Sequence, residues 1–120
     1  MIFVIGGAYQ GKREFVMRNF GISPEDMAVC TPGKLDFSKP CIVAIEEFTR
    51  GCLDPVSFFA ENRALWQDKI LIMEDIFCGV VPMGEENRTW RQNTGRLSQY
   101  LSREAERVSR IFCGLELRLK

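Results

Sequence analysis

The sequence predicts a single α/β domain, spanning residues 1–120, with a mostly parallel β-sheet. Short apolar runs of strand length recur along the chain, and segments with helical spacing lie between most of them. Residues 109–120 change this pattern, because two strand-like runs follow one another there and meet at Gly114. We therefore expect the parallel sheet to end in an antiparallel C-terminal edge strand.

The first element is a buried strand followed by a glycine-rich turn and a helix. Met1–Ile5 is apolar, and a segment with helical spacing begins near Lys12. A strand, a glycine turn with a lysine and a helix form the context in which G-x-x-x-x-G-K-[ST] is a phosphate-binding loop. The pattern predicts a three-layer fold like that of the P-loop NTPases. The expected nucleotide-binding residues are Gly6, Gly7, Ala8, Tyr9, Gln10, Gly11, Lys12 and Arg13.

The residue types of this loop suit an anion. Glycines allow backbone conformations that turn successive N–H groups inward, and the new helix points its positive end at the same place. Lys12 adds a mobile charge for the β- and γ-phosphates of ATP or GTP. The alternative is a glycine turn between strand and helix with an incidental lysine.

Arg13 departs from the motif, which requires Ser or Thr at this position. A hydroxyl there binds Mg²⁺, whereas a guanidinium carries only donors and cannot ligate a metal. Mg²⁺ dependence is therefore not expected from the loop itself, and no metal ligands are assigned. Arg13 could instead form a salt bridge with Glu46 or Asp75, or extend into solvent.

Composition excludes several kinds of function. Sixteen basic residues balance sixteen acidic ones, so we expect neither nucleic acid nor an anionic membrane as a partner. The absence of histidine excludes Ser-His and Cys-His triads and histidine general bases. Five cysteines without a C-x-x-C pair favour a reduced, cytoplasmic protein. Met1 leads directly into the first strand, so we expect no signal peptide.

The middle of the chain carries the candidate carboxylates. Residues 27–30 form a short second strand, and Cys41–Ile45 is a third that ends in Glu46 and Glu47. An acid after a buried strand, downstream of a phosphate loop, usually holds Mg²⁺ directly or through water. Glu46 therefore either faces the phosphate site or merely ends a buried strand. The fourth strand, at 69–73, is also followed by acids.

Two helices complete the expected pattern. Asp54 and Pro55 suggest an N-cap and first helical position of a helix through about Trp66. Its expected core residues are Phe58, Phe59, Leu65 and Trp66. The longest helix is expected at about 85–107, after an apolar loop at 76–84 that packs against the core or a neighbouring subunit. Its expected core stripe is Trp90, Thr94, Leu97, Leu101, Ala105 and Val108.

These motifs resemble the bifunctional adenosylcobinamide kinase/adenosylcobinamide-phosphate guanylyltransferase family of cobalamin assembly. That family begins with a strand and Gly-Gly-Ala-x-x-Gly-Lys-Ser, matched by residues 6–12 with Arg13 departing. Its later segments Asn-Glu-Val-Gly and x-Gly-Ile-Val-Pro correspond to residues 74–82. Its Arg-aromatic-Arg-Asp and Gly-Arg-x-Asn-Gln pattern corresponds to 90–99, and its final two strands to 111–120.

The resemblance implies ATP or GTP as the nucleotide, a cobinamide-type alcohol as the acceptor and a homo-oligomer. Family members are longer, and the part missing here carries the histidine that becomes guanylylated. Because this chain has no histidine, we expect no guanylyl transfer by that route.

Three functions follow as alternatives. The first is a kinase that transfers a phosphoryl group to an alcohol, with Lys12, Glu46 and Asp75 as its catalytic residues. The second is a catalytically degenerate protein that binds a nucleotide or assembles with partners without turnover, and Arg13 is the reason to consider it. The third is a plain structural module.

Overall fold

A six-stranded sheet forms the centre of the molecule in the computed structural model, which describes residues 1–77 and 84–120. The strand order is β2-β3-β4-β1-β5-β6, and all neighbours are parallel except β5 and β6. The strands are β1 Ile2–Gly6, β2 Met27–Val29, β3 Cys41–Val43, β4 Ile70–Glu74, β5 Arg107–Phe112 and β6 Leu115–Arg118. The expected parallel sheet with an antiparallel C-terminal edge strand is confirmed.

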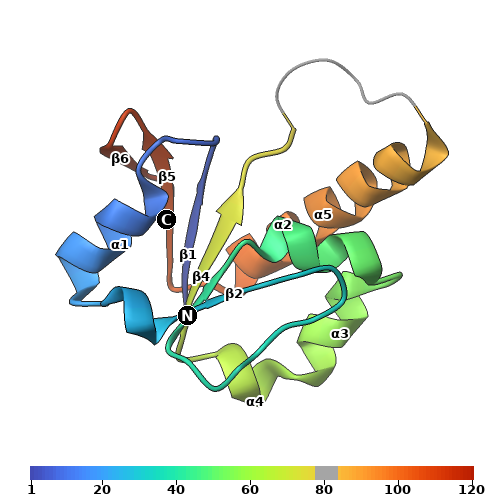
Figure 1. The fold of residues 1–120 in the computed structure, drawn as a ribbon, viewed down its shortest axis with the longest axis horizontal. Helices are drawn as coiled ribbons and strands as arrows, with labels where there is room; N and C mark the ends of the chain where they lie inside the picture. Colours follow the sequence, from blue (N-terminus) through green and yellow to red (C-terminus); the bar gives the residue numbers. More distant parts are fainter. Residues whose placement is uncertain (78–83) are drawn as a thin grey trace.

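The helices cover both faces of the sheet and complete three layers. They are α1 Lys12–Phe20, α2 Ile45–Phe48, α3 Pro55–Glu61, α4 Arg63–Trp66 and α5 Glu85–Glu104. Helix α1 lies alone on one side of the strands, and α2, α3 and α5 lie on the other (Figure 1). Two short 3-10 segments, Pro24–Asp26 and Thr49–Gly51, follow α1 and α2. The predicted three-layer α/β architecture is therefore confirmed.

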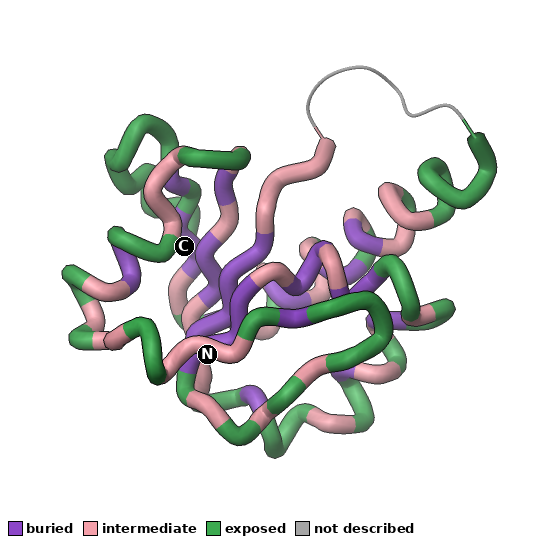
Figure 2. The backbone as a smooth tube through the Cα atoms, viewed as in Figure 1, coloured by how far each residue is buried: buried purple, intermediate pink, exposed green. Residues whose placement is uncertain are grey.

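The core has two parts, one on each side of the sheet. On the α1 side, Phe15 and Val16 pack against alternate residues of the strands, including Val4 and Ile72. The other side is larger and includes Phe3, Ile42, Ile45, Phe48, Phe59, Trp66, Leu71, Leu97 and Leu101. Buried residues run along the central strands (Figure 2). Both faces of these parallel strands are covered, which explains their continuous apolar sequences.

The third strand is shorter than the sequence predicts. It ends at Val43, because Ala44 adopts a left-handed conformation with φ of 64° that cannot continue a strand. Ile45 then starts the four-residue helix α2. Glu46 therefore lies in the first turn of a helix and not at the end of a strand.

The expected helix from Asp54 to Trp66 is two helices. Asp54 caps α3 as predicted, since its carboxylate accepts the backbone N–H of Ser57 at 3.2 Å. The break falls at Asn62, whose side-chain amide donates to the carbonyl of Phe58. Trp66 is buried in α4, but Leu65 is half exposed. The prediction that Leu65 belongs to the core was wrong, because the break at Asn62 changes the direction in which α4 faces.

The long helix ends earlier than expected. Helix α5 stops at Glu104, because Ala105 is extended, and Val108 is buried on β5 instead. Thr94, Leu97 and Leu101 form the buried stripe of α5, as the spacing predicts. The apolar loop expected at 76–84 lies mostly outside the described residues. Within the described part of the chain, no helix is long and apolar enough to cross a membrane.

Candidate functional site

The glycine-rich turn connects β1 directly to α1, as the motif requires. Tyr9 and Gly11 both have positive φ, 60° and 93°, and the Tyr9 side chain is fully exposed. Gly11 is the N-cap of α1 and offers no side chain to bind the first N–H groups of the helix. These groups therefore remain directed at the space in front of the turn, where an anion would be stabilised.

The C-terminal hairpin supports this turn from behind. The Gly114 N–H donates to the carbonyl of Gln10 at 2.8 Å, and the Cys113 N–H donates to the Gln10 side-chain oxygen at 2.6 Å. A Cβ on Gly6 would lie 2.6 Å from the carbonyl oxygen of Ile111, so only glycine fits there. No local sequence signal connects residues 10 and 113, so the sequence does not predict this support.

A cleft of about 360 Å³ opens in front of the turn. Its lining combines the phosphate loop with the ends of β3 and β4 and the start of α2. The lining residues are Tyr9, Gln10, Gly11, Lys12, Arg13, Glu14, Val43, Ala44, Glu46, Ile72 and Glu74. Three carboxylates line the cleft with Lys12. Glu14 follows it on α1, and Glu46 and Glu74 come from elements far apart in the sequence.

Lys12 occupies the motif position and lines the cleft. Its ammonium donates to the carbonyl of Gly7 at 2.7 Å, within the loop itself. Burial lowers the pKa of Lys12, while the negative charges of Glu74 and Glu46 oppose that effect. A phosphate in the cleft would compete with the Gly7 carbonyl for the same charge.

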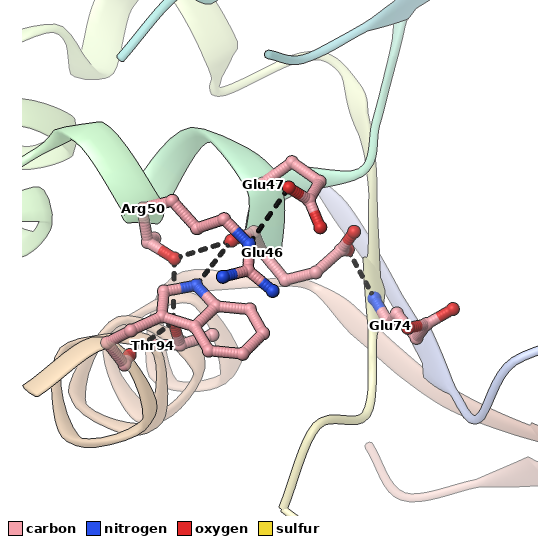
Figure 3. Close-up of polar contacts among 7 residues, drawn as sticks. Glu46, Glu47, Arg50, Glu74 and Thr94 are labelled. Carbon is pink, nitrogen blue, oxygen red and sulfur yellow. Dashed lines mark hydrogen bonds and ion pairs between the residues drawn. The ribbon is translucent and has the colours of Figure 1, made fainter. Parts of the chain in front are cut away.

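Glu46 is buried, with only 5% of its surface exposed. Its Oε1 accepts the backbone N–H of Glu74 at 2.7 Å, and this bond joins α2 to the end of β4 (Figure 3). Burial raises the pKa of Glu46, and the nearby charge of Glu74 raises it further, although the Glu74 amide works in the opposite direction. The group is therefore a carboxylate whose proton affinity is increased at the edge of the cleft.

Glu74 lines the cleft, whereas the expected residue Asp75 does not. The Asp75 carboxylate accepts the N–H of Phe77 at 2.9 Å and lies 3.9 Å from the Arg110 guanidinium. Its own N–H donates to the Gly6 carbonyl at 2.7 Å. Side chains alternate along a strand, so Glu74 shares the side of Ile72, and Asp75 does not. That alternation was the signal that could have identified Glu74.

Arg13 is exposed at the mouth of the cleft. Within residues 1–77 and 84–120 it forms no ion pair with Glu46 or Asp75, so the expected salt bridge is not present. The same part of the chain contains no group of three Cys, Asp or Glu residues that could hold a metal ion. Glu46 and Glu74 are the two cleft-lining carboxylates that come from outside the loop and α1.

The strand order and the glycine turn leading into α1 define an α/β protein with a six-stranded, mostly parallel sheet and a cleft in front of the turn. The chain belongs to the cobinamide kinase / cobinamide phosphate guanyltransferase family, whose model matches residues 54–119. The match includes Glu74, α5 and the C-terminal hairpin, and the phosphate loop and Glu46 lie before it. No curated protein matches the chain.

Proposed function

We propose that residues 1–120 form one nucleotide-binding domain that transfers the γ-phosphoryl group of ATP or GTP to an alcohol of a cobinamide-type substrate. Family membership supports the substrate class. The observation that carries the proposal is the cleft in which Lys12 lies opposite Glu46 and Glu74. Phosphoryl transfer depends mainly on positioning and charge neutralisation, and these residues supply both.

Each residue has a defined role in this proposal. The loop N–H groups and Lys12 bind the nucleotide phosphates and neutralise the charge that develops on the departing diphosphate. Glu46 or Glu74 accepts the proton of the acceptor hydroxyl as its oxygen bonds to the γ-phosphorus and the bond to the β-phosphate oxygen breaks. Glu74 takes the place first assigned to Asp75, because Glu74 lines the cleft.

Mg²⁺ in the cleft would be held by carboxylates and not by a hydroxyl of the loop. The loop offers arginine where the motif has a hydroxyl, so the protein ligands would be the Glu46 and Glu74 carboxylates, together with nucleotide phosphates. When bound, the ion would neutralise charge on the phosphates.

The deciding experiment measures the turnover of ATP and GTP with cobinamide, with and without Mg²⁺. We expect a phosphorylated cobinamide to form, and we expect the Glu74→Gln variant to lose activity. Asp75→Asn is the matched control, since that carboxylate does not line the cleft. Nucleotide binding without any product would contradict the kinase function.

The second candidate is a catalytically degenerate protein that binds a nucleotide without turnover. Arg13 favours it, because a fixed positive charge at the mouth of the cleft disfavours a divalent ion. In that case ATP or GTP would bind in calorimetry, and no product would form with any acceptor.

Guanylyl transfer is not part of the proposed function, because the chain has no histidine to carry the intermediate. Incubation with α-labelled GTP should leave no acid-labile label on the protein. We also propose, from the family resemblance, that the protein is a cytoplasmic homo-oligomer, which sedimentation of the purified chain would test.

A further inference from the structure

Glu46 lies on a helix too short to hold its own position. Helix α2 has four residues, and an isolated helix of that length is unstable in water. Two side chains outside α2 bind its backbone at the Glu46 carbonyl. The indole N–H of Trp90 donates to that oxygen at 2.7 Å, and the Thr49 hydroxyl contacts it at 2.8 Å. Trp90 belongs to α5, so the long helix is attached directly to the residue that carries the carboxylate.

Two threonine hydroxyls near this carbonyl divide their protons among several acceptors. Thr49 and Thr94 are buried, and their hydroxyl oxygens lie 2.6 Å apart. Thr94 also contacts the carbonyl of Trp90 at 2.7 Å. Three hydrogen bonds are therefore possible, but the two hydroxyls carry only two protons. The indole N–H is bound to the Glu46 carbonyl, whereas each hydroxyl proton has two possible acceptors.

The indole ring is itself held in place. The guanidinium of Arg50 lies over the ring, 3.7 Å from its centre, which is a favourable cation–π contact. Arg50 is paired with Glu47 at 3.0 Å, and both residues come from the segment that contains Glu46 (Figure 3). The ring therefore lies against this segment through both its face and its N–H.

We infer that Trp90 is a positioning residue for the Glu46 carboxylate. Its indole N–H fixes the backbone of α2 where Glu46 Oε1 accepts the Glu74 N–H and the carboxylate faces the phosphate loop. The kinetic consequence rests on the proposed function, but the placement of the carboxylate does not. The Glu74 amide reports that placement directly, because its N–H is bound to Glu46.

The test compares the Glu74 backbone amide in three variants by nuclear magnetic resonance and hydrogen exchange. Glu46→Ala defines the amide without its acceptor. Trp90→Phe keeps a ring under Arg50 but removes the indole N–H. Trp66→Phe is the matched control, because the Trp66 indole also donates to a backbone carbonyl at 2.7 Å, that of Phe59, away from the cleft.

In Trp90→Phe we expect the Glu74 amide to move towards its Glu46→Ala position and to exchange faster by about fivefold or more, the scale of one hydrogen bond. In Trp66→Phe we expect it to stay at the wild-type position. An unchanged Glu74 amide in folded Trp90→Phe would overturn the inference. If Trp90→Phe does not fold, the Glu74 amide in Trp90→benzothienylalanine decides in the same way, because that side chain keeps the shape of the indole and lacks its N–H.

A kinetic measurement separates this inference from the proposed function. We expect Trp90→Phe to lower kcat by roughly tenfold while the nucleotide Kd stays within about twofold, because the N–H acts on the carboxylate and not on the phosphate loop. A wild-type protein without turnover would contradict the kinase function, and the Glu74 amide would still decide the role of Trp90.

Discussion

The two walls of the cleft are built in different ways. The loop wall is one continuous segment, residues 6–14, of which residues 9–14 line the cleft. The carboxylate wall consists of Glu46 and Glu74, which lie on α2 and β4 and are joined by a single hydrogen bond of 2.7 Å. The indole N–H of Trp90 on α5 donates to the backbone carbonyl of Glu46. One wall is local in sequence, and the other exists only through contacts between distant elements.

This difference predicts how substitutions in each wall affect the protein. Substitutions in the loop should change the loop directly, because they remove backbone freedom or a charge at the substituted residue. The carboxylate wall should respond to changes in residues that never touch the cleft, because several elements determine its geometry.

The largest effect is expected at the base of the loop wall. In Gly6→Ala the new Cβ would lie 2.6 Å from the Ile111 carbonyl oxygen, a backbone atom that cannot move aside cheaply. The free energy of unfolding should fall by about 2–3 kcal/mol, the range for overpacking. Urea denaturation would measure it.

Gly7→Ala is the matched control for this effect. Its Cβ would lie 3.6 Å from the Gln10 side chain, an ordinary contact, so the loss should stay below about 1 kcal/mol. Equal losses in the two variants would show that the close approach of β5 does not determine this position.

The charge of the loop wall should have the next largest effect. Lys12→Ala should weaken ATP or GTP binding by about 1–3 kcal/mol, the scale of a hydrogen bond to a charged group. Lys34→Ala, an exposed lysine that does not line the cleft, is the control. Unchanged affinity of Lys12→Ala in calorimetry would contradict phosphate binding at this loop.

The carboxylate wall should make the stability of the protein depend on pH. Burial raises the pKa of Glu46 above its ordinary value of 4.5, so the folded protein binds this proton more tightly than the unfolded chain. Stability from this group is present below pH 4.5 and is lost as the pH rises through the folded pKa. Glu46→Gln should therefore be more stable than the wild type at neutral pH and lose that advantage below pH 4.5.

Urea denaturation at several pH values would test this, with the exposed acid Glu61→Gln as the control. Glutamine retains the oxygen that accepts the Glu74 N–H, so the comparison isolates the charge. A constant difference between Glu46→Gln and the wild type across the pH range would contradict the prediction.

The smallest effect is expected where the two walls would share a metal ion. In the wild type, nucleotide affinity should depend little on Mg²⁺, because Arg13 places a positive charge at the mouth of the cleft. Arg13→Ser should restore a Mg²⁺ enhancement of about 1 kcal/mol, and Arg18→Ser, exposed at the far end of α1, should not. Strong enhancement by Mg²⁺ in the wild type would show that the arginine does not exclude the ion.

Much of the fold could be predicted because its signals are local. Apolar runs identified β1 and β4, and Asp54 marked the start of α3. The same holds for the strand, glycine turn and helix around Lys12. These features depend on spacing and on the preferences of neighbouring residues, which the sequence contains directly.

The predictions that were wrong concern places where a backbone conformation or a tertiary contact decides the outcome. The sequence gives no sign that Ala44 is left-handed. This conformation ends β3 and places Glu46 in the first turn of α2. Asn62 breaks an expected helix and leaves Leu65 exposed.

The sequence by itself determined the order of the six strands along the chain and the position of the loop wall, since both follow from hydrophobic spacing and glycine positions. Only the tertiary structure decided that Glu74 and not Asp75 lines the cleft, and that Trp90 on α5 binds the Glu46 backbone. The physical reason is that a cleft wall made of side chains depends on how separate elements pack. That packing is a property of the whole core, and no short segment of sequence encodes it.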